Sequence, residues 1–456
     1  MIRIGIDCGV TFTDIVIVEE DKVSVHKIPS SPADPIQSVL KGLGKFVKQG
    51  QECILRHGTS MPETLLAGRD LKCVLVTNEG FEDLIEIGRE TRPDIYNLNP
   101  AAPRPLIPEA NRLGIRERSS ADGKALASPD QKELDRIKGL IKKAKPDAVA
   151  VVLLHSYANP ENELKIKESL ADLNLPVFLS HQILPELREY ERTSVTAINA
   201  SIQPEMSKYF TALTSLEEPQ IKRLEVMQAN GGATPLKIAV QEPVRCLAAG
   251  PAAGVSAALR IARQSGQKQV AALEIGGTSA GICLSEGDAP LTREREVQGL
   301  PVSLQSVEIH GIGAGTGVEA WVDETGLLRV GPKSAGIEPG PICYGKGEQV
   351  TLCDAHVFLN RIDPDNFLGG EMILQTDRIR GALEMLAEEM EKRGGRKPDL
   401  EEIAEGVIRI ANASMMKNIR FFSQKKGCTL SEMTLVAYGG AGPLHACELA
   451  ESLGVA

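Results

Sequence analysis

Three short runs near the start of the chain alternate apolar and polar positions, and this alternation predicts three β-strands. The runs cover residues 2–6, 14–19 and 23–28, and they are joined by a glycine turn and by Glu20-Asp21-Lys22. Connections this short favour an antiparallel meander. Residues 35–48 then carry apolar side chains every three or four positions, which predicts an amphipathic helix.

The pattern continues with strands and helices in turn. We expect strands at residues 54–59, 72–77, 148–155 and 177–180, and helices at 130–143 and 159–173. This order predicts an α/β first lobe, which we place at residues 1–190. A long helical pattern at 190–213 leads into a second lobe, which we place at residues 191–456.

The second lobe has the same mixed character. Strands are expected at 224–228 and 433–438, a strand–turn–strand unit at 269–284, and helices at 248–263, 376–393 and 400–422. The proline and glycine content of residues 331–347 predicts an extended loop. The predicted fold class is therefore α/β with two lobes.

Two segments, one in each predicted lobe, share an order of residue types. Residues 5–14 read Gly-Ile-Asp-Cys-Gly-Val-Thr-Phe-Thr-Asp, and residues 274–279 read Glu-Ile-Gly-Gly-Thr-Ser. Each fits a strand, a tight turn and a return strand, with a carboxylate beside backbone N–H groups and hydroxyls. Such turns can bind phosphate and Mg²⁺. Either turn alone also fits a plain hairpin, but the pair predicts two lobes that close on one nucleotide.

The candidate site residues come from these turns and from two glycine-rich segments. Asp7 and Glu274 are expected to bind Mg²⁺ and, with Thr13 and His57, to act in catalysis. The predicted ATP-binding residues are Gly9, Thr11, Thr13, Gly276, Gly277, Thr278, Gly313, Gly315, Gly439 and Gly440. The last two follow a predicted strand and precede a helix, a place where a ribose and purine can approach the backbone.

Several other patterns admit a structural explanation. His57 ends a predicted strand and could orient a substrate carbonyl, although a purely structural histidine is the commoner case. Asp354 and His356 would share a face of a strand, which gives half of a metal site with no third ligand. Residues 277–281 match G-x-S-x-G, but a strand rather than a helix follows them, which argues against a nucleophile elbow.

Composition narrows the class of protein. A chain of 456 residues is expected to form two or three domains. A net charge of −10 without a dense Lys/Arg cluster argues against a nucleic-acid surface. Nine scattered cysteines with no C-x-x-C pair indicate reduced thiols. No apolar run is long enough to span a bilayer, so we expect a cytoplasmic protein with no membrane contact.

These motifs together resemble the hydantoinase A/oxoprolinase family over nearly the whole chain. The matching segments are residues 5–14, 57–59, 77–81, 92–96, 189–194, 228–232, 249–252, 274–279, 313–321, 336–345, 363–370 and 438–445. The resemblance implies a two-lobed actin-like ATPase fold with the nucleotide between the lobes. It also implies an A-type subunit that uses ATP and Mg²⁺ to phosphorylate the carbonyl oxygen of a small cyclic amide, such as a hydantoin or 5-oxoproline. Water then opens the ring, commonly with a B-type partner subunit.

Four departures from the family pattern keep alternatives open. Val10 replaces a glycine, Glu274 replaces an aspartate, Ala280-Gly281 replace a closing Thr-Asp, and the segment after Thr59 lacks an asparagine. Val10 is β-branched and resists the positive φ that such turns often require. Without the closing carboxylate, a nucleotide-binding regulatory or assembly subunit becomes an alternative. Because some relatives act on ketones, a carboxylase subunit is a further alternative. Homo-oligomerisation is a further expectation.

Overall fold

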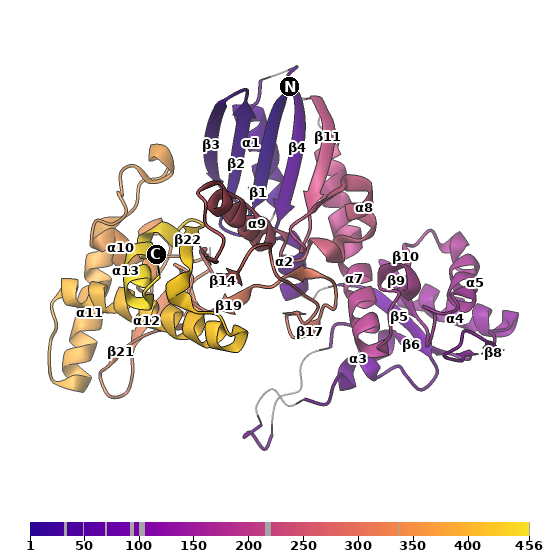
Figure 1. The fold of residues 1–456 in the computed structure, drawn as a ribbon. Helices are drawn as coiled ribbons and strands as arrows, with labels where there is room; N and C mark the ends of the chain where they lie inside the picture. The colour runs from indigo at the N-terminus through magenta and orange to yellow at the C-terminus, as the bar shows by residue number, and fades with distance from the viewer. Residues whose placement is uncertain are drawn as a thin grey trace.

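The computed structural model describes residues 1–31, 34–48, 50–68, 71–91, 95–99, 105–214, 220–336 and 338–455. It is a mixed α/β structure with one six-stranded and two four-stranded sheets among these residues. Figure 1 shows three groups of elements: the six-stranded sheet, a second group around β5 and β9, and a third that holds the C-terminal helices.

The six-stranded sheet confirms the predicted meander. β1 (Ile2–Cys8), β2 (Phe12–Glu19) and β3 (Lys22–Pro29) pair antiparallel in that order. β4 (Glu52–Thr59) lies parallel to β1 on its other side, and β11 (Gln220–Met227) lies parallel to β4. Apolar side chains at every second position of β1 are buried, as a strand with one covered face requires.

The second sheet is parallel throughout, in the order β10-β9-β5-β6. Its central strands β5 (Cys73–Asn78) and β9 (Ala148–Val152) are buried at every position, which explains their continuous apolar sequences. The flanking strands are β6 (Arg112–Ile115) and β10 (Val177–Leu179). Helices α4 (Gln131–Ala144) and α5 (Glu161–Ser169) pack against this unit.

The third sheet repeats the topology of the first. Its order is β19-β14-β13-β22, with bounds His310–Ile312, Ala280–Ser285, Val270–Ile275 and Thr434–Tyr438. β13, β14 and β19 form an antiparallel meander, and β22 lies parallel to β13. β3-β2-β1-β4 have the same order and directions. The similarity between the two turn sequences is therefore matched by a similarity between the two sheets that carry them.

Helices join and cover these sheets. α7 (Glu189–Thr214) is buried along most of its length and contacts β5, β9 and β10 of the second sheet. Its Tyr209 also meets His57 of β4 in the first sheet. α1 (Pro35–Phe46) packs on the first sheet, and α9 (Ala249–Gln264) on β13 and β4. The C-terminal helices are α10 (Leu352–Phe358), α11 (Thr376–Gly394), α12 (Leu400–Lys426) and α13 (Gly442–Leu453).

Shorter elements complete the chain. The helices are α2 (Met61–Gly68), α3 (Leu84–Ile87), α6 (Ser180–Ile183) and α8 (Leu236–Gln241). The strands are β7 (Arg118–Ser119), β8 (Ala125–Ala127), β12 (Ala233–Pro235), β15 (Leu291–Thr292), β16 (Glu296–Val297), β17 (Leu300–Pro301), β18 (Ser306–Val307), β20 (Val318–Val322) and β21 (Leu328–Ser334). β11 and β12 complete the first sheet although they follow residue 190, and the lobe boundary there stays a prediction.

Two expectations were wrong. Part of the predicted 331–347 loop is strand β21, which pairs with β20. Asp354 and His356 lie in helix α10, so they do not share the face of a strand. Thr351 and Asp354 form a capping box at the start of this helix, a sequence signal that we overlooked. Among the described residues, no helix is both long and apolar enough to cross a membrane.

Candidate functional site

The two predicted phosphate turns lie against each other. The first turn joins β1 to β2, and the second joins β13 to β14. A Cβ atom on Gly277 would lie only 2.9 Å from Thr11 Oγ1, so the two turns are in contact at this point. Val10, in the first turn, is not among the residues with positive φ, so its β-branch is accommodated there.

Asp7 and Glu274 stand beside these turns, near the ends of β1 and β13. The side chain of Asp7 is exposed, yet desolvation by the protein around it raises the pKa of its carboxyl. The charge of Asp14 raises this pKa further, and the charge of Lys27 lowers it. Burial, and then the charge of Asp7, raises the pKa of Glu274 to about 7. Water therefore reaches Asp7 although protein lies around it.

The two acids fit a magnesium ion that arrives with phosphates. No three His, Cys, Asp or Glu side chains of the described residues are grouped to hold a metal by themselves. Mg²⁺ in nucleotide sites usually takes one or two carboxylates and fills its other positions with phosphate oxygens and water. A cation between Asp7 and Glu274 would also relieve the repulsion that raises the pKa of Glu274.

The glycine-rich loop at 313–317 packs on the second turn. The N–H of Gly317 donates to the carbonyl of Gly277 at 2.7 Å, and the N–H of Thr316 donates to Gly276 at 3.0 Å. Gly315 is buried, and a Cβ there would lie 2.4 Å from the carbonyl carbon of Thr278. Gly315 thus supports the turn, whereas Gly313 is exposed.

The segment predicted to bind adenosine, Gly439 and Gly440, also lies against the second turn. Gly439 follows β22 with φ of +84°, and a Cβ there would lie 2.7 Å from the carbonyl oxygen of Ile275. The N–H of Ala441 donates to that oxygen at 3.1 Å. Gly439 and Gly440 are both exposed. The structure therefore brings the predicted glycines of the second lobe together around one turn.

Thr13 and His57 lie behind the turns. Thr13 is fully buried, with its hydroxyl 2.9 Å from Ser30 Oγ. His57 is fully buried too; its Nε2 lies 2.8 Å from the Tyr209 hydroxyl, and burial lowers its pKa to about 4, so the ring is neutral. The catalytic roles that we predicted for both residues, and the ATP contact predicted for Thr13, do not fit these surroundings.

Sequence reasoning missed the other neighbours of Asp7. A Cβ on Gly58 or Gly250 would lie 3.4 or 3.3 Å from Asp7 Oδ1. Gly250 belongs to the first turn of α9, whose N-terminal backbone carries partial positive charge. Glu63 on α2 accepts a hydrogen bond from the N–H of Ala248, just before α9. The run of small residues at the start of α9 was the available signal.

Other contacts link the first turn and α1 to the C-terminal half of the chain. The Phe12 ring meets Tyr344 and Phe367 edge-on, with centroids 6.3 and 5.9 Å away. Lys45 Nζ lies 2.5 Å from Glu371 Oε1. The first turn and α1 are thus in contact with residues 344–371 of the chain.

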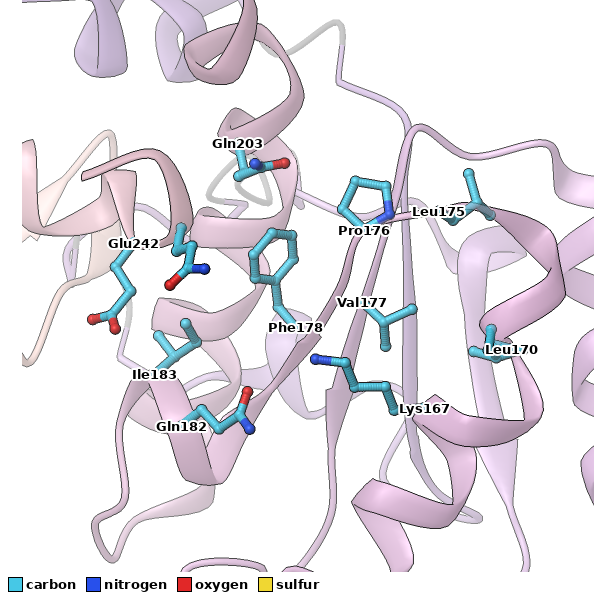
Figure 2. A pocket seen from close by; sticks show the side chains of 12 residues that line it. Lys167, Leu170, Leu175, Pro176, Val177, Phe178, Gln182, Ile183, Gln203 and Glu242 are labelled. Atoms are coloured by element: carbon cyan, nitrogen blue, oxygen red, sulfur yellow. The ribbon is translucent and has the colours of Figure 1, made fainter. Parts of the chain in front are cut away.

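A separate hollow of about 460 Å³ lies away from these residues, and none of the predicted site residues lines it. Figure 2 shows Lys167 of α5, Phe178 of β10 and Gln203 of α7 around it.

Comparison with protein-family models gives two matches. The model described as hydantoinase/oxoprolinase matches residues 192–456, and the model of the hydantoinase/oxoprolinase N-terminal region matches residues 3–173. Of the sequence segments that carried the resemblance, Arg92-Pro93-Asp94 lies outside the described residues, as does residue 337.

Individual relatives cover nearly the whole chain. An uncharacterized protein of Methanocaldococcus jannaschii is 36% identical over 99% of this chain and 69% of its own length. The crystal structure of ATP-dependent caprolactamase from Pseudomonas jessenii is 30% identical, with a TM-score of 0.81 over 99% of this chain and 68% of that one. A nucleotide-free structure of acetone carboxylase is 27% identical, with a TM-score of 0.85 over 99% and 67%. The chain therefore spans about two thirds of each of these three proteins.

Proposed function

The chain belongs to the hydantoinase/oxoprolinase family, and on this premise we propose that it is the A-type, ATP-using subunit of an enzyme that hydrolyses a small cyclic amide. The observation that carries the proposal is the contact between the two turns, with Asp7 and Glu274 beside it. The relationship to ATP-dependent caprolactamase supports the cyclic-amide class.

We further propose an actin-like ATPase fold with ATP between the lobes. The repeated sheet topology supports this, because it supplies one turn from each lobe at the same cleft. Gly9, Thr11, Gly276, Gly277 and Thr278 would offer backbone N–H groups and hydroxyls to the phosphates. Gly439, Gly440 and Gly313, which are exposed at the rim, would face the nucleoside or the substrate.

The chemistry follows from the weakness of an amide as an electrophile. Phosphorylation of its carbonyl oxygen creates a good leaving group, after which water can open the ring. Phosphoryl transfer depends mainly on positioning and charge neutralisation. Mg²⁺ carried in with ATP would supply charge neutralisation, with Asp7 and Glu274 as its protein ligands. The start of α9 would add N–H groups beside Asp7.

A carboxylase subunit is the second candidate, favoured by the structural similarity to acetone carboxylase. A ketone would then take the place of the amide carbonyl. A B-type partner subunit is part of the first proposal, and a cytoplasmic location and homo-oligomerisation remain predictions.

The test is Mg²⁺-dependent ATP hydrolysis by the purified chain, alone and with a co-expressed B-type subunit. Hydantoin, 5-oxoproline, a larger lactam and a simple ketone are compared as stimulants. Stimulation by a cyclic amide supports the first proposal, and stimulation by the ketone with bicarbonate supports the second. Tight ATP binding without turnover under every condition would contradict both proposals and favour a regulatory subunit.

A further inference from the structure

Three backbone carbonyls of the first turn are hydrogen-bonded within the protein. The carbonyl of Cys8 accepts from the N–H of Ser60 at 3.0 Å and from the Ser60 hydroxyl at 3.1 Å. The carbonyl of Gly9 accepts from the Ser30 hydroxyl at 2.8 Å. The carbonyl of Thr11 accepts from the N–H of Ser30 at 2.9 Å. Ser30, which directly follows β3, therefore binds the turn at two points.

The N–H groups of the same turn are not used in this way. Those of Val10 and Thr11 form no hydrogen bond among the residues that the structure describes. Val10 is 41% exposed, so this part of the turn meets solvent. Free N–H groups whose neighbouring carbonyls are bonded elsewhere can bind an anion, because the donors face it and those acceptors do not repel it. The bonds to the carbonyls thus determine which charge the turn can bind.

The second turn holds its corresponding carbonyl with a backbone group. Gly9 directly follows β1, and Gly276 directly follows β13, so the two glycines occupy equivalent places in the two sheets. The carbonyl of Gly276 accepts from the N–H of Thr316 at 3.0 Å. The carbonyl of Gly9 has the Ser30 hydroxyl as its one partner among the described contacts. A single side chain in the first lobe therefore does what the main chain does in the second.

Thr13 fixes the direction of the Ser30 hydroxyl. Thr13 Oγ1 lies 2.9 Å from Ser30 Oγ. A hydroxyl carries one proton, and Ser30 uses its proton on the carbonyl of Gly9, so Thr13 is the donor to Ser30. Both side chains are buried, Thr13 completely and Ser30 with 8% exposure, which leaves water little access to either bond. Hydroxyls in such a chain polarise and strengthen one another.

We propose that Ser30, oriented by Thr13, is the positioning residue that holds the first turn in its anion-binding form for the phosphates of ATP. The inference rests on the proposed binding of ATP by this turn, but not on the identity of the compound that is hydrolysed. Without the Ser30 hydroxyl, the carbonyl of Gly9 loses its partner inside the protein. A buried carbonyl without a partner is unfavourable. Rotation of this peptide towards solvent would satisfy the carbonyl, but it would also turn a partial negative charge towards the phosphates.

The test variants are Ser30→Ala and Thr13→Val, with Ser38→Ala as the matched control. Ser38 is 5% exposed, and its hydroxyl also donates to a backbone carbonyl, that of Pro29 at 3.1 Å, which lies outside the turn. Calorimetry on the full chain gives the affinity for a non-hydrolysable ATP analogue with Mg²⁺. We expect binding to be about 3- to 10-fold weaker in each test variant, the range of one net hydrogen bond. Ser38→Ala should stay within twofold of wild type, and Thr13→Ser, which keeps the hydroxyl, should bind like wild type.

Adenosine separates a positioning role from a purely structural one. It lacks phosphates, so its affinity, measured by competition with a fluorescent ATP analogue, should be the same in the wild type and in both test variants. An equal loss of adenosine and ATP affinity would overturn the inference, as would ATP affinity within twofold of wild type in Ser30→Ala. Thr13→Val takes the place of Ser30→Ala in both comparisons if urea unfolding shows that Ser30→Ala is not folded.

The inference and the proposed function can fail separately. Weaker ATP binding in the test variants, together with an absence of amide-stimulated turnover in the wild type, would support the inference and overturn the proposed hydrolase. Amide-stimulated turnover with equal ATP affinity in all variants would overturn the inference alone. A wild-type chain that binds no ATP would overturn both.

Discussion

The contact between the two turns can be tested by adding one methyl group. Gly277→Ala places that methyl 2.9 Å from Thr11 Oγ1, well inside normal contact distance. Overpacking of this kind typically costs about 1–3 kcal/mol. Thr11→Ala removes the obstructing atom and leaves Thr11 Cβ as the next neighbour, at 3.7 Å. The Gly277→Ala substitution should therefore cost little in a Thr11→Ala background.

The measurement is the free energy of unfolding in urea for the wild type, both single variants and the double variant. We expect a coupling energy of about 1–3 kcal/mol between the sites, as for other residues in direct contact. Thr11→Val is the matched control, because it keeps the shape of threonine and should keep the full cost of Gly277→Ala. An equal cost in the Thr11→Ala and wild-type backgrounds would refute the contact, and with it the argument that the lobes present their turns to one ligand.

Three further predictions concern single residues. The pKa of Glu274 is raised to about 7 in the folded protein, so its stabilising contribution is complete below the pKa of Glu274 in the unfolded chain and is lost as pH rises through 7. The unfolding free energy of Glu274→Gln should therefore increase relative to that of the wild type between pH 5 and 8. A difference that stays constant with pH would contradict this. His57→Phe removes the hydrogen bond between His57 and the buried Tyr209 hydroxyl and should cost about 0.5–1.5 kcal/mol of stability, with kcat within twofold of wild type. A large loss of kcat at full stability would restore the catalytic role of His57. Gly439→Ala combines a positive φ with a methyl 2.7 Å from Ile275 O, so it should weaken binding of a fluorescent ATP analogue, and unchanged affinity would separate this loop from the nucleotide.

Local patterns predicted much of the fold. The alternation in β1 to β3 and the long helical pattern of α7 reflect neighbours in sequence, so both could be read without the structure. The same alternation would also have placed Thr13 correctly. Thr13 shares the face of β2 with Ile15 and Ile17, which are buried, and it is therefore buried with them.

Contacts between distant segments could not be read in this way. Arg295 stands in the run Arg-Glu-Arg-Glu, which is typical of a solvated surface. Its half-buried position depends on Val297, Leu300, Val302 and Leu304, which are buried in the core formed with β1, β4 and α7. Glu63 follows Thr59 in the segment that departs from the family pattern, and nothing in that segment singled it out. Its hydrogen bond with the N–H of Ala248 depends on α2, a helix too short to give a clear period.

The order of strands in the first sheet also bears on how the chain acquires its structure during synthesis. β4 ends at Thr59, and its parallel neighbour β11 begins at Gln220, so about 160 residues separate two strands that lie side by side. Closing so long a loop slows folding, because chain entropy is lost before the pairing contacts form. The parallel sheet of β5, β6, β9 and β10 lies entirely within that interval. On the ribosome, this inner unit can fold first, while the sheet that carries Asp7 waits for β11 to emerge.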